Sequence, residues 1–136
     1  MKNRFKFRVW SRQSNSYIKE KMFYIDRFGG LFKYEKAKST VYINADSPYI
    51  ISLCKDNYIV EQCTGLKDKN GKLIYEGDIL DNISIDEQYE VRWDEDTARF
   101  CCITDNEIYD FDNFDVTAFE VIGNIHENKE YEKWVY

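Results

Sequence analysis

The stretch from Thr64 to Leu80 constrains the fold most, because it packs two turn signals and the start of a strand into 17 residues. Asn70-Gly71 lies at the centre of the first turn, and both residues tolerate the positive φ that a type I′ hairpin requires. Glu76-Gly77-Asp78 forms the second turn and opens a strand over 79–85. We assign a structural turn role to Gly65 (closing the strand before it), Asp68, Asn70, Gly71, Gly77 and Asp78.

The same stretch contains a specific pattern: Thr64-Gly65-Leu66, Asp68, Asn70-Gly71 and Ile74-Tyr75-Glu76-Gly77-Asp78-Ile79. Three further segments accompany it in order, at 5–10, 89–100 and 120–128. Together they resemble the YopX-like proteins, small proteins encoded by bacteriophages and prophages. The match is weakest over 20–55. The resemblance implies a phage accessory protein of unknown biochemical function, with no family catalytic residues to transfer.

Length and composition predict one domain that is mainly β. The chain has 136 residues, enough for a hydrophobic core, and its 17% aromatic content favours strands. One proline and six glycines argue against a flexible linker. No apolar run approaches the roughly 20 residues of a membrane span, and the N-terminus has no apolar segment of a secretory signal. We therefore expect a soluble protein of the bacterial cytoplasm, with no membrane contact.

Short alternating segments predict the architecture. Strands are expected over 5–10, 17–18, 22–25, 58–63, 79–85, 89–93, 98–104 and 118–125, and the apolar residues 49–53 are expected to be buried. Residues 31–38 fit a helix or a strand, and 109–117 fit an irregular loop or a single helical turn. We predict an SH3-like, curved β-barrel of about five strands from 58 to 125, in an α+β arrangement with a β-rich lobe over 1–50. A short C-terminal helix is expected over 127–136, capped by Asn128, with Tyr131, Trp134 and Val135 on one face.

Candidate reactive residues are few, and we predict neither an enzyme, nor a cofactor, nor a metal. Cys54, Cys63, Cys101 and Cys102 lack C-x-x-C spacing and are expected to be buried thiols. His126 is the one histidine, so catalysis would need a desolvated acid or thiol beside it. Asp110, Asp112 and Asp115 have carboxylates of the kind that bind Ca²⁺ or Mg²⁺. Their segment lacks the glycine and the terminal glutamate of an EF-hand loop, so we expect a solvated acidic face there instead of a metal site.

Charge is divided unevenly along the sequence. Residues 1–40 hold 11 Lys or Arg against three acidic residues, whereas residues 81–120 hold 13 Asp or Glu against two arginines. Lys2, Arg4, Lys6 and Arg8 are expected on one face of a strand, where they suit a nucleic-acid backbone or protect a sheet edge. The acidic residues Asp94, Glu95, Asp96, Asp110, Asp112 and Asp115 suit a solvated interaction face or a mimic of nucleic acid.

These observations favour a protein that acts by binding. The leading hypothesis is self-association into a homo-oligomer through the oppositely charged halves, since fields of opposite sign steer association. A host bacterial protein is a second possible partner. The alternatives are a nucleic-acid-binding module that uses the basic strand, and an acidic mimic that blocks a host factor.

Overall fold

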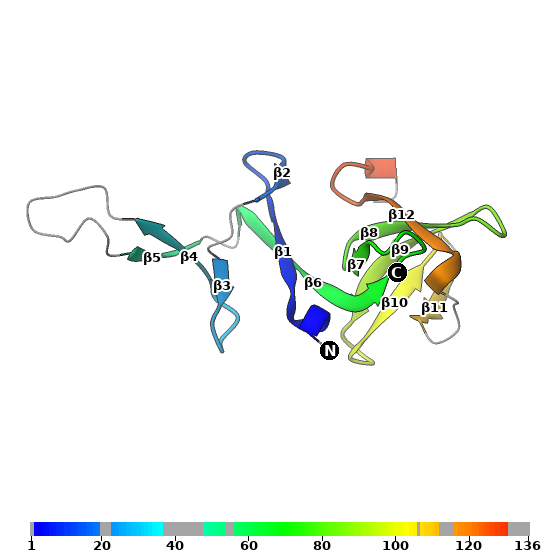
Figure 1. Ribbon diagram of the computed structural model, residues 1–136, viewed down its shortest axis with the longest axis horizontal. Helices are drawn as coiled ribbons and strands as arrows, with labels where there is room; N and C mark the ends of the chain where they lie inside the picture. Colours follow the sequence, from blue (N-terminus) through cyan, green and yellow to red (C-terminus); the bar gives the residue numbers. More distant parts are fainter. Residues whose placement is uncertain are drawn as a thin grey trace, which may run out of the picture. The chain divides into compact units, whose positions relative to one another are not determined.

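The chain folds mainly into antiparallel β-structure (Figure 1). The computed structural model describes residues 2–19, 23–36, 48–53, 56–105, 107–111 and 116–130. Within these residues the elements in chain order are η1 (Lys2–Phe5), β1 (Phe7–Ser11), β2 (Ser16–Tyr17), β3 (Phe23–Ile25), β4 (Leu31–Lys36), β5 (Pro48–Ser52), β6 (Tyr58–Lys67), β7 (Leu73–Tyr75), β8 (Asp78–Asn82), β9 (Glu87–Asp94), β10 (Arg99–Ile103), β11 (Ile108–Asp110), η3 (Val116–Ala118) and β12 (Phe119–Asn124). The predicted β class is confirmed.

The chain divides into two compact units. Unit 1 comprises Met1–Arg8 and Glu61–Tyr136, and unit 2 comprises Val9–Val60. The chain therefore leaves unit 1 within β1 and re-enters it within β6. That the chain forms a single domain remains a prediction.

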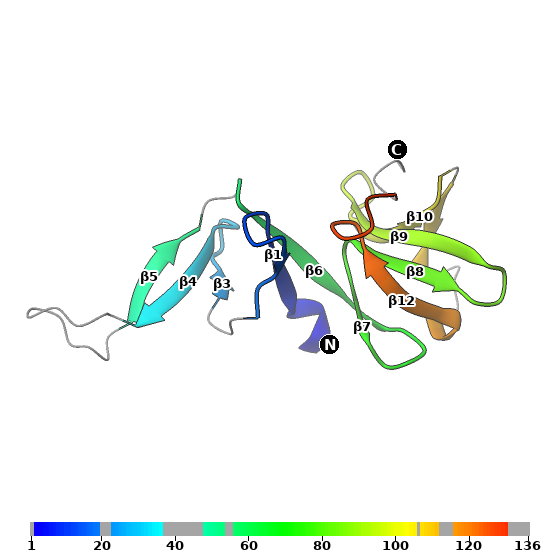
Figure 2. The same ribbon diagram turned by 90° about the horizontal axis from the view of Figure 1, so that it is seen from above.

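Unit 1 is built on a five-stranded antiparallel sheet with the strand order β11-β10-β9-β8-β12. The sheet is strongly curled (Figure 2). Its edge strands, β11 and β12, are not paired with each other in the part of the chain that the structure describes. The sheet is a curled half-barrel, in keeping with the curved β-structure that we expected, and its likeness to an SH3 barrel stays a prediction.

The core of unit 1 lies on one face of this sheet. It contains Ile74 from β7 together with Leu80, Tyr89, Val91, Cys102 and Phe119 from the sheet, none of them more than 2% exposed. Leu80 lies directly opposite Tyr89, and Val91 lies opposite Cys102, so the core is made of cross-strand pairs. The Tyr89 ring meets the Phe119 ring edge-on, with centroids 5.6 Å apart. This packing explains why the apolar residues Tyr89 and Val91 alternate with the charged residues Glu90 and Arg92 along β9.

The turn between β6 and β7 differs from the predicted type I′ hairpin. Of its two central residues only Gly71 adopts a positive φ, at 79°. The Gly71 N–H donates to the Asp68 carbonyl (3.0 Å), and the Asp68 N–H donates to the Lys72 carbonyl (2.8 Å). This is a three-residue loop whose last residue is left-handed, a common alternative to type I′. Gly65 does not end a strand either, since it lies within β6 where the pairing with β7 shifts register.

Unit 2 contains a hairpin and a three-stranded sheet. β2 pairs with β1 as an antiparallel hairpin, with Trp10 opposite Tyr17. β3, β4 and β5 form an antiparallel sheet in that order. β4 settles the ambiguous segment 31–38 as a strand as far as Lys36. The Tyr24 and Phe32 rings stack with centroids 5.2 Å apart, because their residues pair directly across β3 and β4.

Two strand boundaries and one element differ from the sequence-based prediction. The opening strand begins only at Phe7, because residues 2–5 form the 3₁₀ helix η1, and the Lys6 N–H donates to the Asn3 carbonyl (3.0 Å). β8 ends at Asn82, whose carbonyl accepts from the N–H groups of Ile85 and Asp86. Residues 108–110 form the strand β11 where a loop or helical turn was expected.

The predicted C-terminal helix is not seen in the described residues. Residues 125–127 form a turn, and only Lys129 and Glu130 have 3₁₀ geometry. The expected apolar face of that helix, at Tyr131, Trp134 and Val135, lies outside the described residues. No helix in the described ranges is long and apolar enough to cross a membrane.

Candidate functional site

A buried group of charged side chains surrounds Arg8. Its Nε donates to Oε2 of Glu61 (2.6 Å), and its Nη2 forms an ion pair with Oδ1 of Asp78 (2.7 Å). Nη2 also donates to the carbonyl of Glu76 (3.1 Å). Glu61 is 2% exposed and Asp78 is 1% exposed. A buried carboxylate is costly unless it is paired and hydrogen-bonded, and Arg8 supplies both requirements to two of them at once.

His126 completes this group, which we call the Arg8 network (Arg8, Glu61, Asp78 and His126). Its Nε2 contacts Oε1 of Glu61, while Oε2 of the same carboxylate accepts from Arg8. The backbone N–H of His126 donates to Oδ1 of Asn124 (3.0 Å), in the turn that follows β12. A desolvated acid therefore does lie beside the histidine. Because that acid is also bound to Arg8, the arrangement ties β1, β6 and the end of β12 together.

Gly77 and Asp78 of the second turn form part of the Arg8 network's wall. Gly77 has a φ of +81°, and a Cβ placed on it would lie 2.8 Å from Oε1 of Glu61. Oδ2 of Asp78 accepts the Tyr75 N–H (2.8 Å), while its other oxygen binds Arg8. Burial raises the pKa of Asp78, and the nearby guanidinium only partly opposes this increase. The sequence predicted the turn role of Gly77 and Asp78. It did not predict that they lie against the buried ion pair of Arg8.

Asp68 connects the first turn to the last strand. Its Oδ1 accepts the N–H groups of Asn70 and Lys72, each at 2.9 Å, and its Oδ2 accepts the Val121 N–H at 3.0 Å. Burial acts to raise the pKa of Asp68, but these three backbone hydrogen bonds outweigh it and lower the pKa below the usual value. The predicted turn role of Asp68 thus extends to a contact 53 residues away.

The four basic candidates do not share a strand face. Lys2 and Arg4 belong to η1, and the positions of their side chains lie outside the description. Lys6 precedes β1 and is exposed, whereas Arg8 points into the Arg8 network. The expected stripe of four cations along one strand is therefore wrong as a geometric prediction. Nucleic-acid binding by these residues stays a prediction.

The described acidic candidates Asp94, Glu95, Asp96 and Asp110 lie on or next to the β9–β10 hairpin. Oδ1 of Asp94 accepts the Asp96 N–H (3.0 Å) and so closes the tip, where Glu95 and Asp96 are exposed. Asp110 on β11 forms an ion pair with Arg99 (2.8 Å). Asp112 and Asp115 lie outside the described residues. Across the described ranges, no group of three His, Cys, Asp or Glu side chains is arranged to hold a metal ion.

Three of the four cysteines are described, and all three are buried free thiols: Cys63, Cys101 and Cys102. Burial raises the pKa of the Cys101 and Cys102 thiols, so these thiols are protonated at neutral pH. A protonated thiol is a poor nucleophile and a poor metal ligand. Cys54 lies outside the described residues.

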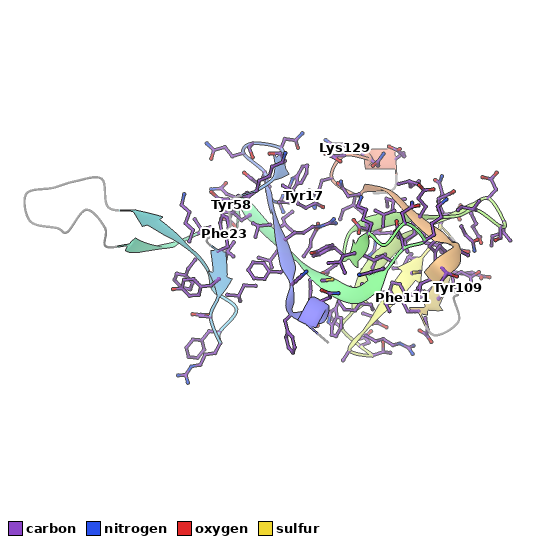
Figure 3. The ribbon with its side chains drawn as sticks, in the orientation of Figure 1. Tyr17, Phe23, Tyr58, Tyr109, Phe111 and Lys129 are labelled. Atoms are coloured by element: carbon purple, nitrogen blue, oxygen red, sulfur yellow. The ribbon has the colours of Figure 1, made fainter. Side chains whose placement is uncertain are left out.

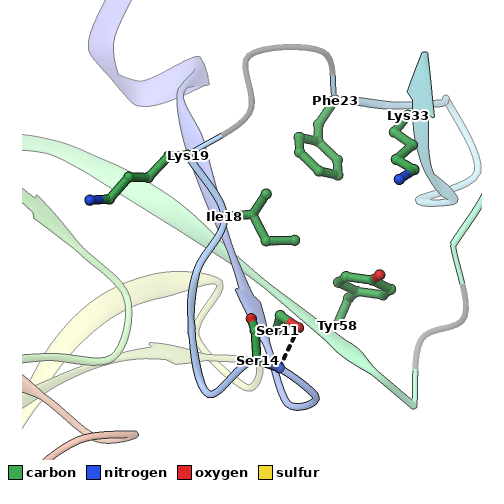
Figure 4. Close-up of a pocket in the computed structure, with 7 residues that line it drawn as sticks. All are labelled: Ser11, Ser14, Ile18, Lys19, Phe23, Lys33 and Tyr58. Carbon is green, nitrogen blue, oxygen red and sulfur yellow. Dashed lines mark hydrogen bonds between the residues drawn. The ribbon is translucent and has the colours of Figure 1, made fainter. Parts of the chain in front are cut away.

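A cavity of about 530 Å³ lies within unit 2 and was not predicted (Figures 3 and 4). Its walls combine apolar, hydroxyl and cationic side chains: Ser11, Ser14, Ile18, Lys19, Phe23, Lys33 and Tyr58. Two smaller cavities, of about 240 and 260 Å³, lie in unit 1 beside β10 and β11. None of these three cavities has a member of the Arg8 network in its wall.

Comparison with known proteins identifies the family. The model of the YopX protein family matches residues 6–131. Protein EF1440 from Enterococcus faecalis has a similar crystal structure, with a TM-score of 0.54 and 24% identity over 92% of this chain and 95% of that one. Protein YopX from Bacillus subtilis has a TM-score of 0.59 and 17% identity over 94% of this chain and 98% of that one. No curated protein matches the sequence. The family match over nearly the whole chain confirms the resemblance: this protein belongs to the YopX family.

Proposed function

We propose that this YopX family member is a non-enzymatic phage or prophage accessory protein that acts in the bacterial cytoplasm by binding protein, primarily copies of itself. The observation that carries the proposal is the charge of the two units. Unit 2 has eight Lys or Arg against five Asp or Glu, whereas unit 1 has 11 against 20. Opposite net charges on two parts of one chain favour contacts between unlike parts of neighbouring molecules.

The chemistry of the described residues supports binding over catalysis. The buried Cys101 and Cys102 thiols are protonated, and the acid beside His126 is held by Arg8. The carboxylates at the tip of the β9–β10 hairpin, Glu95 and Asp96, are exposed to water. Free thiols are also what a reducing cytoplasm maintains.

Light scattering at two salt concentrations tests the proposal. The Debye length is about 30 Å at 0.01 M salt and about 3 Å at 1 M, so electrostatic association should be strong in the first buffer and weak in the second. We expect a mass well above that of the 16.4 kDa monomer at low salt, and a monomer at high salt. A monomeric mass in both buffers would refute electrostatic self-association.

The alternatives are distinguished by purification from a bacterial host with and without nuclease. A host protein that is recovered under both conditions supports a host partner, as either a binding or a mimic function requires. Nucleic acid that disappears with nuclease, with no protein partner, supports the basic N-terminal residues as the binding surface. In that case reversing the charge of the exposed Lys6 should flatten the salt dependence of binding.

A further inference from the structure

The turn between β8 and β9 exposes two isoleucine side chains, and the acidic residue Asp86 directly follows the second of them. Ile83 is 51% exposed and Ile85 is 59% exposed. Hydrogen bonds to Asn82 close the turn: the Asn82 carbonyl accepts the N–H groups of Ile85 (3.2 Å) and Asp86 (2.9 Å), and Oδ1 of Asn82 accepts the Ser84 N–H (3.1 Å). We call residues 83–86 the tip.

The chemistry of the unit 2 cavity complements that of the tip. Ile18, Phe23 and Tyr58 give its wall apolar surface, and Lys33 adds an ammonium group that points toward the space beside the two rings (Figure 4). The Lys19 ammonium points away from this space and adds positive charge at the rim. No described lining residue is acidic. A volume of about 530 Å³ is within the range of pockets that hold small ligands, so it has room for the apolar side chain of an isoleucine.

We propose that the tip of one copy inserts into the unit 2 cavity of a second copy. Ile85 packs against Phe23 and Tyr58, and the Asp86 carboxylate lies toward Lys33. This inference rests on the proposed self-association and specifies which surfaces meet. The partner is another copy of this chain, because the two complementary surfaces both occur on it and have opposite charge and matching apolar character.

The contact joins two different surfaces, so each copy has one tip to give and one cavity to receive. Such a heterologous contact closes into a ring or continues as a chain of subunits. It also makes a strict prediction about mixtures. A copy without a functional tip and a copy without a functional cavity can still form one contact with each other, and no second contact.

The experiment uses two full-length variants at low salt, with mass measured by sedimentation velocity. The tip variant is Ile85→Ser with Asp86→Asn, since Asn tolerates the positive φ of 53° at position 86. The cavity variant is Lys33→Glu. Matched controls make the same kinds of change elsewhere: Ile122→Ser, at an isoleucine that is 46% exposed on β12, and Arg27→Glu, at an exposed cation of unit 2.

Each variant alone should associate at least about tenfold more weakly than the wild type, because it loses either an apolar contact or a charge pair. The controls should associate as the wild type does. An equimolar mixture of tip and cavity variants should give a 1:1 dimer and nothing larger, which also shows that both variants are folded.

Three results would overturn the inference. If the wild type associates and both variants associate equally well, the surfaces are wrong while self-association stands. If both variants are monomeric but their mixture forms no dimer, the substitutions do not act on one shared contact. A wild type that is monomeric at every salt concentration refutes self-association and the inference together.

Discussion

Replacing Gly77 by alanine tests whether position 77 needs glycine because the buried Glu61 carboxylate lies against it. The new Cβ would lie 2.8 Å from Oε1 and 3.2 Å from Cδ of Glu61. A flexible, exposed glutamate would simply move aside. Glu61 is 2% exposed, and its two oxygens are bound to Arg8 and His126, so it cannot move without weakening one of these contacts.

The expected cost has two parts. A left-handed backbone costs a non-glycine residue about 1–2 kcal/mol. Displacing the Glu61 carboxylate from one charged hydrogen bond costs about a further 1.5–3 kcal/mol. Gly77→Ala should therefore lower the free energy of unfolding by roughly 3–5 kcal/mol, a large share of the ~5–15 kcal/mol that holds a typical domain folded.

Gly71→Ala is the matched control. Gly71 has nearly the same φ, +79° against +81°, yet a Cβ placed on it meets nothing within 4 Å. It should lose only the strain part, about 1–2 kcal/mol. Urea unfolding followed by tryptophan fluorescence measures both losses. Losses that agree within about 0.5 kcal/mol would refute the steric argument, because the measured strain would then account for everything.

Three further predictions follow from the same contacts. Arg8→Met removes the cation that pairs with the buried Glu61 and Asp78 carboxylates and should cost about 3–5 kcal/mol in urea unfolding, of which adding Asp78→Asn should restore a part; no recovery would contradict the pairing. Asp68 has a lowered pKa in the folded state, so its stabilisation is complete above its ordinary value of 3.8 and is lost as pH falls through the lower folded value. Asp68→Asn should therefore cost about 1–2 kcal/mol at pH 6 and less below pH 4, and a pH-independent cost would contradict this sign. In a Cys54→Ser variant the three buried thiols should react with a thiol reagent at pH 8 only after unfolding, and rapid native labelling of any of them would show the burial to be wrong.

Local pattern was sufficient to predict most strands of unit 1. Tyr89 and Val91 alternate with polar residues because one face of β9 meets the core. Turn composition likewise located the loop at Gly71, although not its type. The Asp68 carboxylate accepts the Asn70 N–H and favours a three-residue loop over the type I′ geometry of Asn-Gly. This competing interaction depends on where β12 lies, since the same carboxylate also binds the Val121 N–H.

The Arg8 network could not be predicted from pattern. Period-two alternation placed Arg8 with Lys6 on a solvated face, which is the usual position for a cation on a short strand. Its partner Glu61 lies 53 residues away, and the contact between Glu61 and His126 spans 65 residues. Nothing in the local sequence distinguishes an arginine that meets water from one that meets two buried carboxylates. The sequence offered one indication of this contact. The basic segment at 5–10 and the Glu76-Gly77-Asp78 turn both belong to the family pattern.

The residues of the family pattern and the proposed binding surfaces have different roles. Asp68, Gly77, Asp78 and Arg8 of the pattern make buried contacts that hold β1, β6, β7 and β12 in place. Arg8 and Glu61 are also the residues at which the chain leaves and re-enters unit 1, so their ion pair fixes both strands at that boundary. The exposed isoleucines of the tip and the lining of the unit 2 cavity lie outside the central pattern. Substitutions in the pattern should therefore change stability, whereas substitutions at the tip should change association and leave stability nearly unaltered. A tip variant that unfolds as readily as Arg8→Met would contradict that division.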